Sequence, residues 1–352
     1  MIKKSYSEQE LRVIAEKPGF FGGPGTPIYN TPISYRENMK DLYWKKDPTW
    51  VHSFMETDGI RSTLYNDNFG RAGAHNDGLI DVFGAQWKFV PSAGGSITVA
   101  GQPVFEDAND WKEKVKMPDV ESWDWENDLK DVDSNPRFAQ IFTFVNGFWF
   151  ERLISLMDFD NAAMALIDEE QQDAVYEFFE ATTEVAIKLV DLICKYAPSI
   201  DGFNIHDDWG AQRSPFFSEE VARKLFLPHM KKLVGHIHSK GRFCTLHSCG
   251  CVQDRVTIFI EAGFDGWQPQ TMNDLDKLYE LYGDQIVFDV MPEEFDPENE
   301  EAAIQAARNF VDRYCQKGKV AGIGTGGRPA LGCKAFAEEL YRYSREKFLS
   351  FE

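Results

Sequence analysis

The sequence predicts an α/β fold, a single (β/α)8 TIM-like barrel over residues 1–352 with an irregular N-terminal extension that caps the barrel mouth. Short β-rich runs alternate with longer helical stretches from residue 138 onward, which is typical of parallel strands joined by crossover helices. Polar residues follow the ends of successive predicted strands, and 352 residues suit one barrel. A doubly wound sheet shows the same alternation, but polar residues after so many strands favour a barrel, because all its βα loops open on one face.

The extension, first strand and cap are assigned to residues 1–137, which are the less regular part of the chain. They contain the turn cluster Gly22-Gly23-Pro24-Gly25 and a predicted strand near Trp50 to Met55. The longest predicted helix, roughly Glu169 to Tyr196, carries apolar residues at three- and four-residue spacing, as a helix with one buried face does. The strands predicted in residues 138–352 are, in order, Ala139 to Val145, Asp201 to His206, Arg242 to His247, Gly266 to Pro269, Ile286 to Val290 and Val320 to Gly324.

Composition excludes several classes of partner. The formal net charge is −20, so nucleic acid and anionic membranes would be repelled by this chain. No segment approaches the roughly 18 uninterrupted apolar residues of a transmembrane helix, and no apolar signal region follows the first residues. We therefore expect a cytoplasmic protein with no nucleic-acid or membrane partner. Its six cysteines are expected to be thiols, which leaves them available to a metal ion.

A candidate metal site lies in the segment Phe243-Cys244-Thr245-Leu246-His247-Ser248-Cys249-Gly250, where a predicted strand ends. Imidazole nitrogen and thiolate sulfur are ligands that Zn²⁺ prefers, so His247 and Cys249 form a plausible pair, and Cys333 offers a third ligand. Three protein ligands leave one coordination position open, as in catalytic zinc sites. Simple burial is the competing interpretation, because free cysteine is among the most often buried residue types.

Two adjacent acids, Asp207 and Asp208, follow the strand predicted to end at His206 and are the candidate catalytic residues. Neighbouring side chains point in different directions, so we expect one of the two to face the pocket and to orient substrate or donate a proton. Capping of the next helix is the alternative interpretation of this pair. Four further residues at or after strand ends are predicted to bind substrate: Trp209, Gln212, Gln270 and Asp289.

Four segments carry a resemblance to a known family: Asp207-Asp208-Trp209-Gly210-Ala211-Gln212-Arg213, His236-Ile237-His238-Ser239-Lys240-Gly241, His247-Ser248-Cys249-Gly250 and Glu261-Ala262-Gly263-Phe264-Asp265. They resemble the uroporphyrinogen decarboxylase superfamily, and within it the cobalamin-dependent methyltransferase branch of O-demethylases and coenzyme M methyltransferases. The resemblance implies a distorted barrel with zinc held by His247, Cys249 and Cys333. Because some ether-cleaving members are thought to use carboxylate ligands, Glu293 is an alternative ligand. The Arg-Gln-Ala-Gly-Arg segment of the decarboxylases is absent, so decarboxylation is not expected.

The function that this resemblance implies is zinc-dependent transfer of a methyl group from a methoxylated aromatic compound to the cob(I)alamin of a separate corrinoid protein. Zinc would act as a Lewis acid on the leaving oxygen. The corrinoid is expected on a partner protein because this chain lacks the Asp-x-His-x-x-Gly signature of cobalamin-binding modules. An aromatic donor would stack on aromatic side chains, and seven lie in predicted capping segments and loops: Tyr43, Trp44, Trp50, Trp87, Phe148, Trp149 and Trp209.

Two alternative functions stay open. The same ligands would serve methyl transfer from a methylcorrinoid to a thiol such as coenzyme M, since zinc holds a thiol as thiolate at neutral pH. A non-catalytic ligand-binding barrel would keep the scaffold without the chemistry. A panel of methyl donors with a cob(I)alamin acceptor distinguishes the two enzymes, and ligand binding without any reaction indicates the third function.

Overall fold

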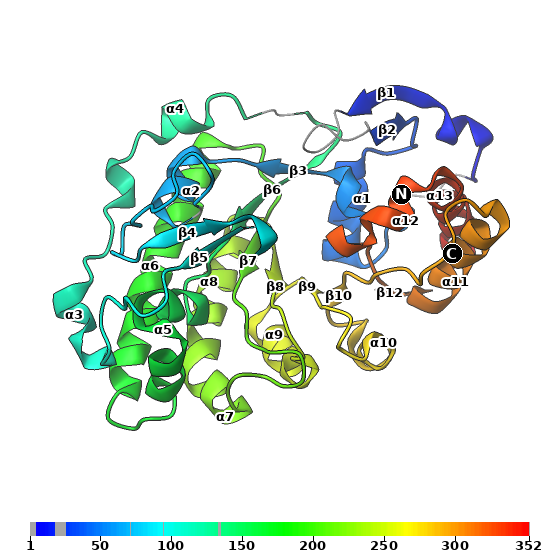
Figure 1. Cartoon of the computed structure of the whole chain (residues 1–352). Coiled ribbons are helices and arrows are strands. Elements are labelled where there is room, and N and C mark those ends of the chain that lie inside the picture. The colour runs from blue at the N-terminus through cyan, green and yellow to red at the C-terminus, as the bar shows by residue number, and fades with distance from the viewer. Residues whose placement is uncertain (1–4, 18–25, 71, 94, 133–134, 352) are drawn as a thin grey trace. The chain divides into compact units, whose positions relative to one another are not determined.

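The computed structural model describes residues 5–17, 26–70, 72–93, 95–132 and 135–351 (Figure 1). The chain divides into two compact units. The first unit comprises Met1–Asp58, Asn135–Gln140 and Asp265–Glu352, and the second comprises Gly59–Ser134 and Ile141–Phe264. The predicted turn cluster Gly22 to Gly25 lies outside the described residues. The prediction of one domain over the whole chain stays a prediction.

The second unit contains three neighbouring parallel strands, β6, β7 and β8. Their pairing aligns Phe144 with Ile205, and His206 with His247. The predicted strands are confirmed to within one residue at each end, because runs of buried apolar and β-branched residues suit a sheet covered on both faces. The strands that lie wholly or partly in this unit are β3 (Thr57–Ile60), β4 (Trp87–Val90), β5 (Gly95–Thr98), β6 (Ala139–Phe144), β7 (Gly202–His206) and β8 (Phe243–His247).

Helices of the second unit connect these strands and pack against one another. In α6, buried residues recur at three- and four-residue spacing, for example Val175, Phe178 and Thr182, as the sequence predicted for this segment. α6 packs against α8, and a π-helical turn over Ala222–Phe226 separates α8 from α7. The helices of this unit are α2 (Thr63–Asn68), α3 (Trp111–Lys114), α4 (Trp125–Leu129), α5 (Phe150–Ala165), α6 (Gln172–Tyr196), α7 (Glu219–Val221), α8 (Leu227–Ser239) and α9 (Val256–Ala262).

The contact between α8 and α6 buries a histidine, His229, which is 3% exposed. Its ring lies 4.4 Å from the ring of Tyr176 and 6.1 Å from that of Phe179, between ring centroids. The Nε2 atom has no hydrogen-bond partner among the described residues. Burial, with a smaller contribution from the charge of Lys232, lowers the pKa of His229 to about 4. The folded second unit therefore holds this imidazole in its neutral form.

We expect acid to destabilise the protein through His229. Between about pH 6.5 and pH 4 the unfolded chain binds a proton at this residue and the folded chain does not, so the free energy of unfolding falls as the pH falls. The loss by pH 4 is up to about 3 kcal/mol. Urea unfolding of the wild type and of His229→Leu, measured at several pH values from 7 to 4, tests this. An equal pH dependence in the two proteins would assign the acid sensitivity to other groups.

The first unit contains a second set of parallel strands. β9 pairs with β10 in parallel, and single parallel bridges join Asp289 to Gly322 and Ser53 to Ile323. The predicted strand at Val320 to Gly324 is only partly confirmed, because Lys319–Val320 forms a hairpin with Cys315–Gln316 instead. The strands wholly in this unit are β1 (Val13–Lys17), β2 (Thr26–Tyr29), β9 (Gly266–Gln268), β10 (Val287–Phe288), β11 (Cys315–Gln316) and β12 (Lys319–Val320).

The N-terminal segment of the first unit is fixed to its C-terminal helix by a buried ion pair. Arg345 Nε donates to Glu10 Oε2 at 2.9 Å, and Tyr341 Oη donates to the same oxygen at 2.6 Å. Beside it, Trp50 packs on Tyr341, with ring centroids 5.3 Å apart. The helices of this unit are α1 (Tyr35–Lys40), α10 (Leu275–Tyr282), α11 (Glu300–Tyr314), α12 (Arg328–Gly332) and α13 (Lys334–Leu349).

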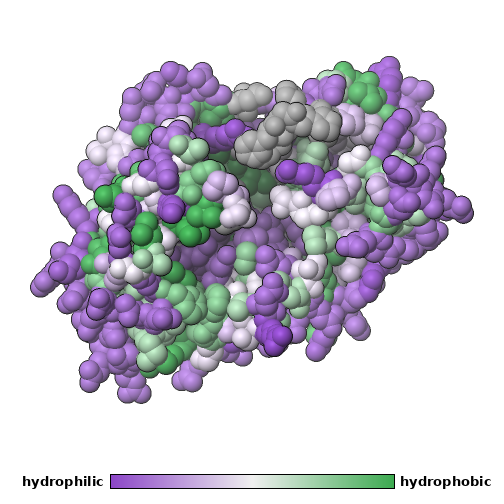
Figure 2. Space-filling model, viewed as in Figure 1, coloured by the Kyte–Doolittle hydropathy of each residue, from purple (hydrophilic) through white to green (hydrophobic). Residues whose placement is uncertain are grey.

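These elements confirm an α/β fold with parallel strands joined by helices, while barrel closure stays a prediction. Figure 2 shows hydrophilic residues over most of the viewed face, which agrees with the net charge of −20. On the second unit, hydrophobic residues gather over the β4–β5 hairpin and α5, where Ile97 and Met164 are 50% and 58% exposed. Among the described residues, no helix is both long and apolar enough to cross a membrane.

Candidate metal centre

The candidate metal centre forms at the carboxyl ends of β7 and β8 in the second unit. β7 ends at His206 and is followed by Asp207 and Asp208, and β8 ends at His247, two residues before Cys249. Because neighbouring parallel strands end at the same edge of a sheet, the residues that follow them come together there. The polar residues that follow these two strands, which the sequence analysis identified, are therefore adjacent in space.

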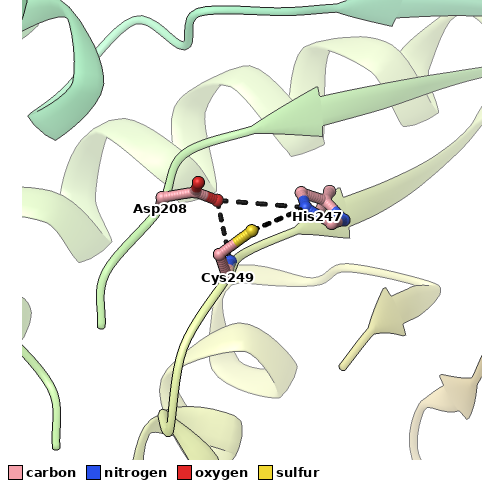
Figure 3. A group of neighbouring side chains, drawn as sticks. All are labelled: Asp208, His247 and Cys249. Atoms are coloured by element: carbon pink, nitrogen blue, oxygen red, sulfur yellow. Dashed lines mark hydrogen bonds and ion pairs between the residues drawn. The ribbon is translucent and has the colours of Figure 1, made fainter. Parts of the chain in front are cut away.

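Three side chains converge at this edge: Asp208, His247 and Cys249 (Figure 3). Each offers one ligand atom, and these atoms all lie within 4.8 Å of one another. His247 Nε2 is 3.1 Å from Cys249 Sγ and 4.0 Å from Asp208 Oδ1. The backbone N–H of Cys249 donates to Asp208 Oδ1 at 2.7 Å, which ties the two loops together. Among the described residues, no other group of three histidine, cysteine or acidic side chains meets this criterion.

The donor set of this cluster fits a zinc ion. With zinc–ligand bonds of about 2.0–2.3 Å, a tetrahedral site holds its ligand atoms roughly 3.4–3.6 Å apart, and the two distances from His247 Nε2 fall on either side of that range. All three side chains are half-buried, so they are held in place yet reachable from solvent. The arrangement therefore identifies a possible metal-binding triad of one carboxylate, one imidazole and one thiol.

Burial and nearby negative charges keep the Cys249 thiol protonated when no cation is present. Burial, then the negative charge of Asp208 and its hydrogen bond, then the charge of Glu151, raise the pKa of the Cys249 thiol to about 12. A divalent cation has the opposite influence, because it stabilises the thiolate that coordinates it. Metal binding at this cluster should therefore release a proton from Cys249.

The two candidate catalytic acids occupy different environments. Asp208 faces the cluster, whereas Asp207 is fully buried and accepts hydrogen bonds from Trp209 Nε1 at 2.6 Å and from the backbone N–H of Glu151 at 3.0 Å and of Phe150 at 3.3 Å. The latter two belong to the first turn of α5, whose own N-cap residue makes no side-chain cap. Asp207 thus caps α5, the helix that precedes it in the chain, and not the next one.

Burial raises the pKa of Asp207 to about 7, against the opposing influence of its hydrogen bonds. The carboxyl group holds the loop after β7 against the start of α5, because its two oxygens accept hydrogen bonds from these donors. A positioning role suits this placement, and a direct catalytic role for Asp207 stays a prediction.

Glycines allow the loops at this edge to touch. Gly250, in the loop after Cys249, has φ +92°, and a Cβ atom there would lie 2.2 Å from the backbone carbonyl of Gly210, in the loop after β7. Gly147, before α5, has φ +46°, and its Cβ would lie 2.7 Å from both Asp207 Oδ1 and the carbonyl oxygen of His206. Larger residues at these two positions would force the loops apart.

His206 is a site residue that the sequence analysis did not select. It pairs with His247 in the β7–β8 register, and the two imidazole rings lie 4.5 Å apart between centroids at an angle of 33°. The ring of His206 therefore restricts the orientation of His247. The sequence predicts that His206 and His247 each end a strand. Only the pairing register of β7 and β8 shows that the two histidines are neighbours.

Two predicted substrate-binding residues lie in the loop after β7. Trp209 is fully buried, and its ring packs against Phe217, Phe226 and Phe259 at centroid distances of 5.1, 5.0 and 5.3 Å. Its indole therefore belongs to the interior of the second unit. Gln212 is exposed on the loop, and its role stays a prediction.

The other predicted site residues belong to the first unit. Asp289 follows β10 and accepts a hydrogen bond from Gln268 Nε2 at 3.1 Å, while burial raises the pKa of its carboxyl group. Gln270 is half-buried after β9. Their part in substrate binding stays a prediction.

The two remaining candidate ligands also lie in the first unit. Cys333 is half-buried directly before α13, with its Sγ atom 3.6 Å from the carbonyl oxygen of Pro297. Glu293 is exposed and accepts a hydrogen bond from Asn309 Nδ2 at 2.6 Å. Within the second unit, Asp208 takes the third place beside His247 and Cys249. Ligation by Cys333 or Glu293 stays a prediction.

The aromatic residues expected to line a substrate pocket are mostly interior. Trp44 is 44% exposed, but six of the seven are buried: Tyr43, Trp50, Trp87, Phe148, Trp149 and Trp209. Trp149, for example, donates from Nε1 to Thr183 Oγ1 at 3.0 Å within the interior of the second unit. These six side chains pack the cores of their units, so they give no support to an aromatic lining.

Known proteins share the fold of this chain, but comparisons of its sequence find no match. No family model matches the chain, and no curated protein matches it in sequence. The fold is similar to that of a methyltransferase from Methanosarcina mazei, with a TM-score of 0.56 over 90% of this chain and 99% of that chain, at 14% identity. A xylose isomerase-like TIM barrel protein from Mycobacterium smegmatis, in complex with magnesium, matches 63% of this chain and 78% of that chain, at 13% identity and a TM-score of 0.35.

Proposed function

We propose that the protein is a zinc-dependent methyltransferase that moves a methyl group from a small methyl donor to the corrinoid of a separate protein. The observation that carries the proposal is the convergence of Asp208, His247 and Cys249 at two adjacent strand ends. The similarity in fold to the methyltransferase from Methanosarcina mazei supports methyl transfer as the class of reaction. The corrinoid acceptor rests on the sequence resemblance alone.

Zinc would be held by Asp208, His247 and Cys249, with Cys333 as the alternative third ligand that the sequence suggested. Bound there, zinc supplies Lewis-acid chemistry for the negative charge that develops when a methyl group leaves an ether oxygen. The chain's own residues position the donor set: the backbone N–H of Cys249 holds Asp208, and the ring of His206 packs on His247. Ligands oriented by such contacts keep their geometry and affinity.

The methyl donor is proposed to be small and to carry an ether. A methoxylated aromatic compound stays the first donor to test, as the sequence resemblance suggested, although the buried aromatic residues do not favour it over other ethers. Thiol methylation would use the same ligands in the reverse half-reaction, so it is an outcome of the same experiment.

The test combines metal analysis with a donor panel. We expect protein purified without chelators to contain one zinc ion per chain, and to methylate cob(I)alamin with at least one methoxylated donor. His247→Ala should lose both properties, whereas His236→Ala, which alters a histidine on α8 that pairs with Asp191, should keep both. Transfer from methylcobalamin to a thiol in the absence of donor demethylation would assign the reverse reaction. A protein without metal, or with metal and no methyl transfer in either direction, would contradict the proposal.

A further inference from the structure

We propose that the exposed C-terminal end of α5, with the turn that follows it, is a docking surface for a basic protein partner. Such a partner presents apolar side chains flanked by lysine and arginine. This inference goes beyond the proposed function and does not depend on it, because the surface contains none of the candidate metal ligands. The surface, which we call the α5 patch, consists of three exposed apolar side chains: Phe159, Met164 and Ile167.

The apolar side chains of the α5 patch lie on one side of the helix. Phe159 is 41% exposed, and Met164 and Ile167 are each 58% exposed. Phe159, Ala163 and Ile167 recur at four-residue spacing, and Met164 follows Ala163 directly. The backbone N–H of Ile167 donates to the carbonyl oxygen of Met164 at 3.0 Å, which continues the turn beyond the end of α5. Figure 2 shows the hydrophobic surface over α5, and contiguous apolar surface of this kind marks sites of protein contact.

An interruption in α5 comes directly before the patch. Asp158 has φ +59° and ψ 165°, a backbone conformation that is open to glycine and strained for other residues. Its carboxylate accepts a hydrogen bond from the backbone N–H of Gly101 at 2.9 Å. The first part of α5 is interior, with Leu153, Leu156 and Met157 fully buried. The exposed apolar residues all follow the interruption.

The segment after β5, residues 99–111, is held against the end of α5 by further hydrogen bonds. The backbone N–H of Ala108 donates to Gln171 Oε1 at 2.7 Å. Asn109 Nδ2 donates to the carbonyl oxygen of Glu170 at 3.3 Å. The side chains of this segment and of residues 153–171 therefore belong to the same part of the second unit as the α5 patch.

These two segments make the surroundings of the patch acidic. Residues 99–111 and 153–171 contain aspartate and glutamate but no lysine or arginine. The acidic side chains exposed there are Glu106, Asp107, Asp110, Asp160, Glu169 and Glu170. Two lysines have contacts nearby, but Lys112 pairs with Glu177 at 2.6 Å. The other, Lys224, donates to Gln172 Oε1 at 2.5 Å. Because exposed carboxylates are ionised at pH 7, the α5 patch lies in a negatively charged surface.

The charge of this surface selects the kind of partner. Nucleic acid and anionic membranes are repelled by it. A symmetric contact with a second copy of the chain would place the same acidic surface against itself, which like-charge repulsion disfavours. A protein that combines an apolar centre with lysine and arginine complements both features of the surface. A basic amphipathic segment is therefore the ligand that the α5 patch fits.

Synthetic peptides provide a probe for this surface. The probe is a fluorescein-labelled helix of about 18 residues, with leucine on one face and lysine on the other. Two comparison peptides carry glutamate in place of lysine, or serine in place of leucine. By fluorescence anisotropy, we expect the full-length protein to bind the leucine–lysine peptide at least about tenfold more tightly than either comparison peptide. The affinity should fall as salt screens the charges. Binding should protect residues 99–111 and 153–171 from hydrogen exchange.

The apolar part of the surface is tested by Met164→Ser combined with Ile167→Ser. Both side chains are more than half exposed, so the variant should keep its fold. We expect it to bind the leucine–lysine peptide about tenfold more weakly, because it loses the apolar area that the peptide would cover. Leu281→Ser is the matched control, since it removes an apolar side chain that is 51% exposed on α10 in the first unit.

The charged part is tested by Glu169→Gln combined with Glu170→Gln. We expect this variant to bind the leucine–lysine peptide about fivefold more weakly and with a smaller dependence on salt. Glu300→Gln combined with Glu301→Gln makes the same change in net charge in the first turn of α11. That control should keep the affinity within about twofold.

Several outcomes would overturn the proposal. Equal losses in the patch variants and their controls, or no binding by the wild type, would leave only unspecific attraction to an acidic protein. Self-association in sedimentation that Met164→Ser with Ile167→Ser abolishes would assign the patch to a second copy. Binding to vesicles of phosphatidylcholine and phosphatidylglycerol through the same residues would assign it to a membrane. None of these outcomes depends on metal content, so they are distinguishable from a failure of the proposed function.

Discussion

Cys249→Ala is expected to lower the zinc affinity of the protein by more than about 100-fold. Loss of groups that only orient a ligand already costs about 10- to 100-fold, and Cys249→Ala removes a metal–sulfur bond outright while keeping the backbone N–H that holds Asp208 at 2.7 Å. Its Sγ atom lies 3.1 Å from His247 Nε2, so no other described thiol is placed to substitute for it in the triad. Competition with a chromophoric chelator measures the affinity.

Two companion variants identify the third ligand. We expect Asp208→Ala to weaken zinc binding strongly and Cys333→Ala to leave it within a few-fold, because Asp208 already completes a triad within the second unit. Cys194→Ala, which removes a half-buried thiol from the last turn of α6, is the matched control. Zinc binding that survives in Asp208→Ala but fails in Cys333→Ala would restore the ligand set implied by the sequence resemblance.

Strands that repeat a regular pattern could be predicted well from the sequence. Ala139–Phe144, Gly202–His206 and Phe243–His247 are runs of apolar residues with turn signals on either side, and local patterning is sufficient to define them. The region around Val320 to Gly324 was harder, because the hairpin at Lys319–Val320 and the single bridges at Gly322 and Ile323 depend on long-range pairing. Residues before 137 have short elements whose existence depends on packing and not on periodicity.

The part of the candidate site that could be predicted from the sequence is the pair His247 and Cys249, because both lie at the end of one predicted strand. His247 and Cys249 are two residues apart in the sequence, so their side chains meet within one loop. Asp208 joins them because β7 and β8 are neighbours, and the start of α5 is fixed to the same loop because Asp207 caps that helix. Those relations follow from the tertiary arrangement, and single-sequence patterns do not contain it. The sequence analysis placed Trp209 at the substrate; its ring is part of the interior, and its role in substrate binding stays a prediction.

Helix α5 is fixed to the N-terminal part of the second unit by a fully buried ion pair. Arg152 Nη1 lies 2.6 Å from Asp81 Oδ2, and both side chains are 0% exposed. The guanidinium also donates to the carbonyl oxygen of Phe69 at 3.2 Å and lies 4.6 Å from the centroid of the Phe83 ring. Asp81 in turn accepts a hydrogen bond from Trp87 Nε1 at 2.9 Å. One arginine therefore holds together several segments that are far apart in sequence.

Arg152→Met is expected to lower the free energy of unfolding by about 3–5 kcal/mol, a large part of the 5–15 kcal/mol that stabilises a typical domain. The methionine fills similar space, but the substitution leaves the Asp81 carboxylate buried without its countercharge, and burying an unpaired charge is costly. Urea unfolding at pH 7 measures the change. Arg223→Met is the control, because Arg223 pairs with Glu261 at a surface where both side chains are more than a third exposed, and an exposed pair contributes about 1 kcal/mol or less.

Asp81→Asn combined with Arg152→Met separates the unpaired charge from the lost packing. The amide removes the negative charge while its oxygen can still accept from the backbone N–H groups of Phe83 and Ala85, each 3.0 Å from Asp81 Oδ1. We therefore expect the double variant to be more stable than Arg152→Met alone. Losses in the free energy of unfolding add for independent substitutions, but they should not add for the two partners of one ion pair. If the double variant instead loses as much free energy of unfolding as the two single variants together, the charge pair contributes little to the stability. The packing of the arginine then accounts for the loss in Arg152→Met.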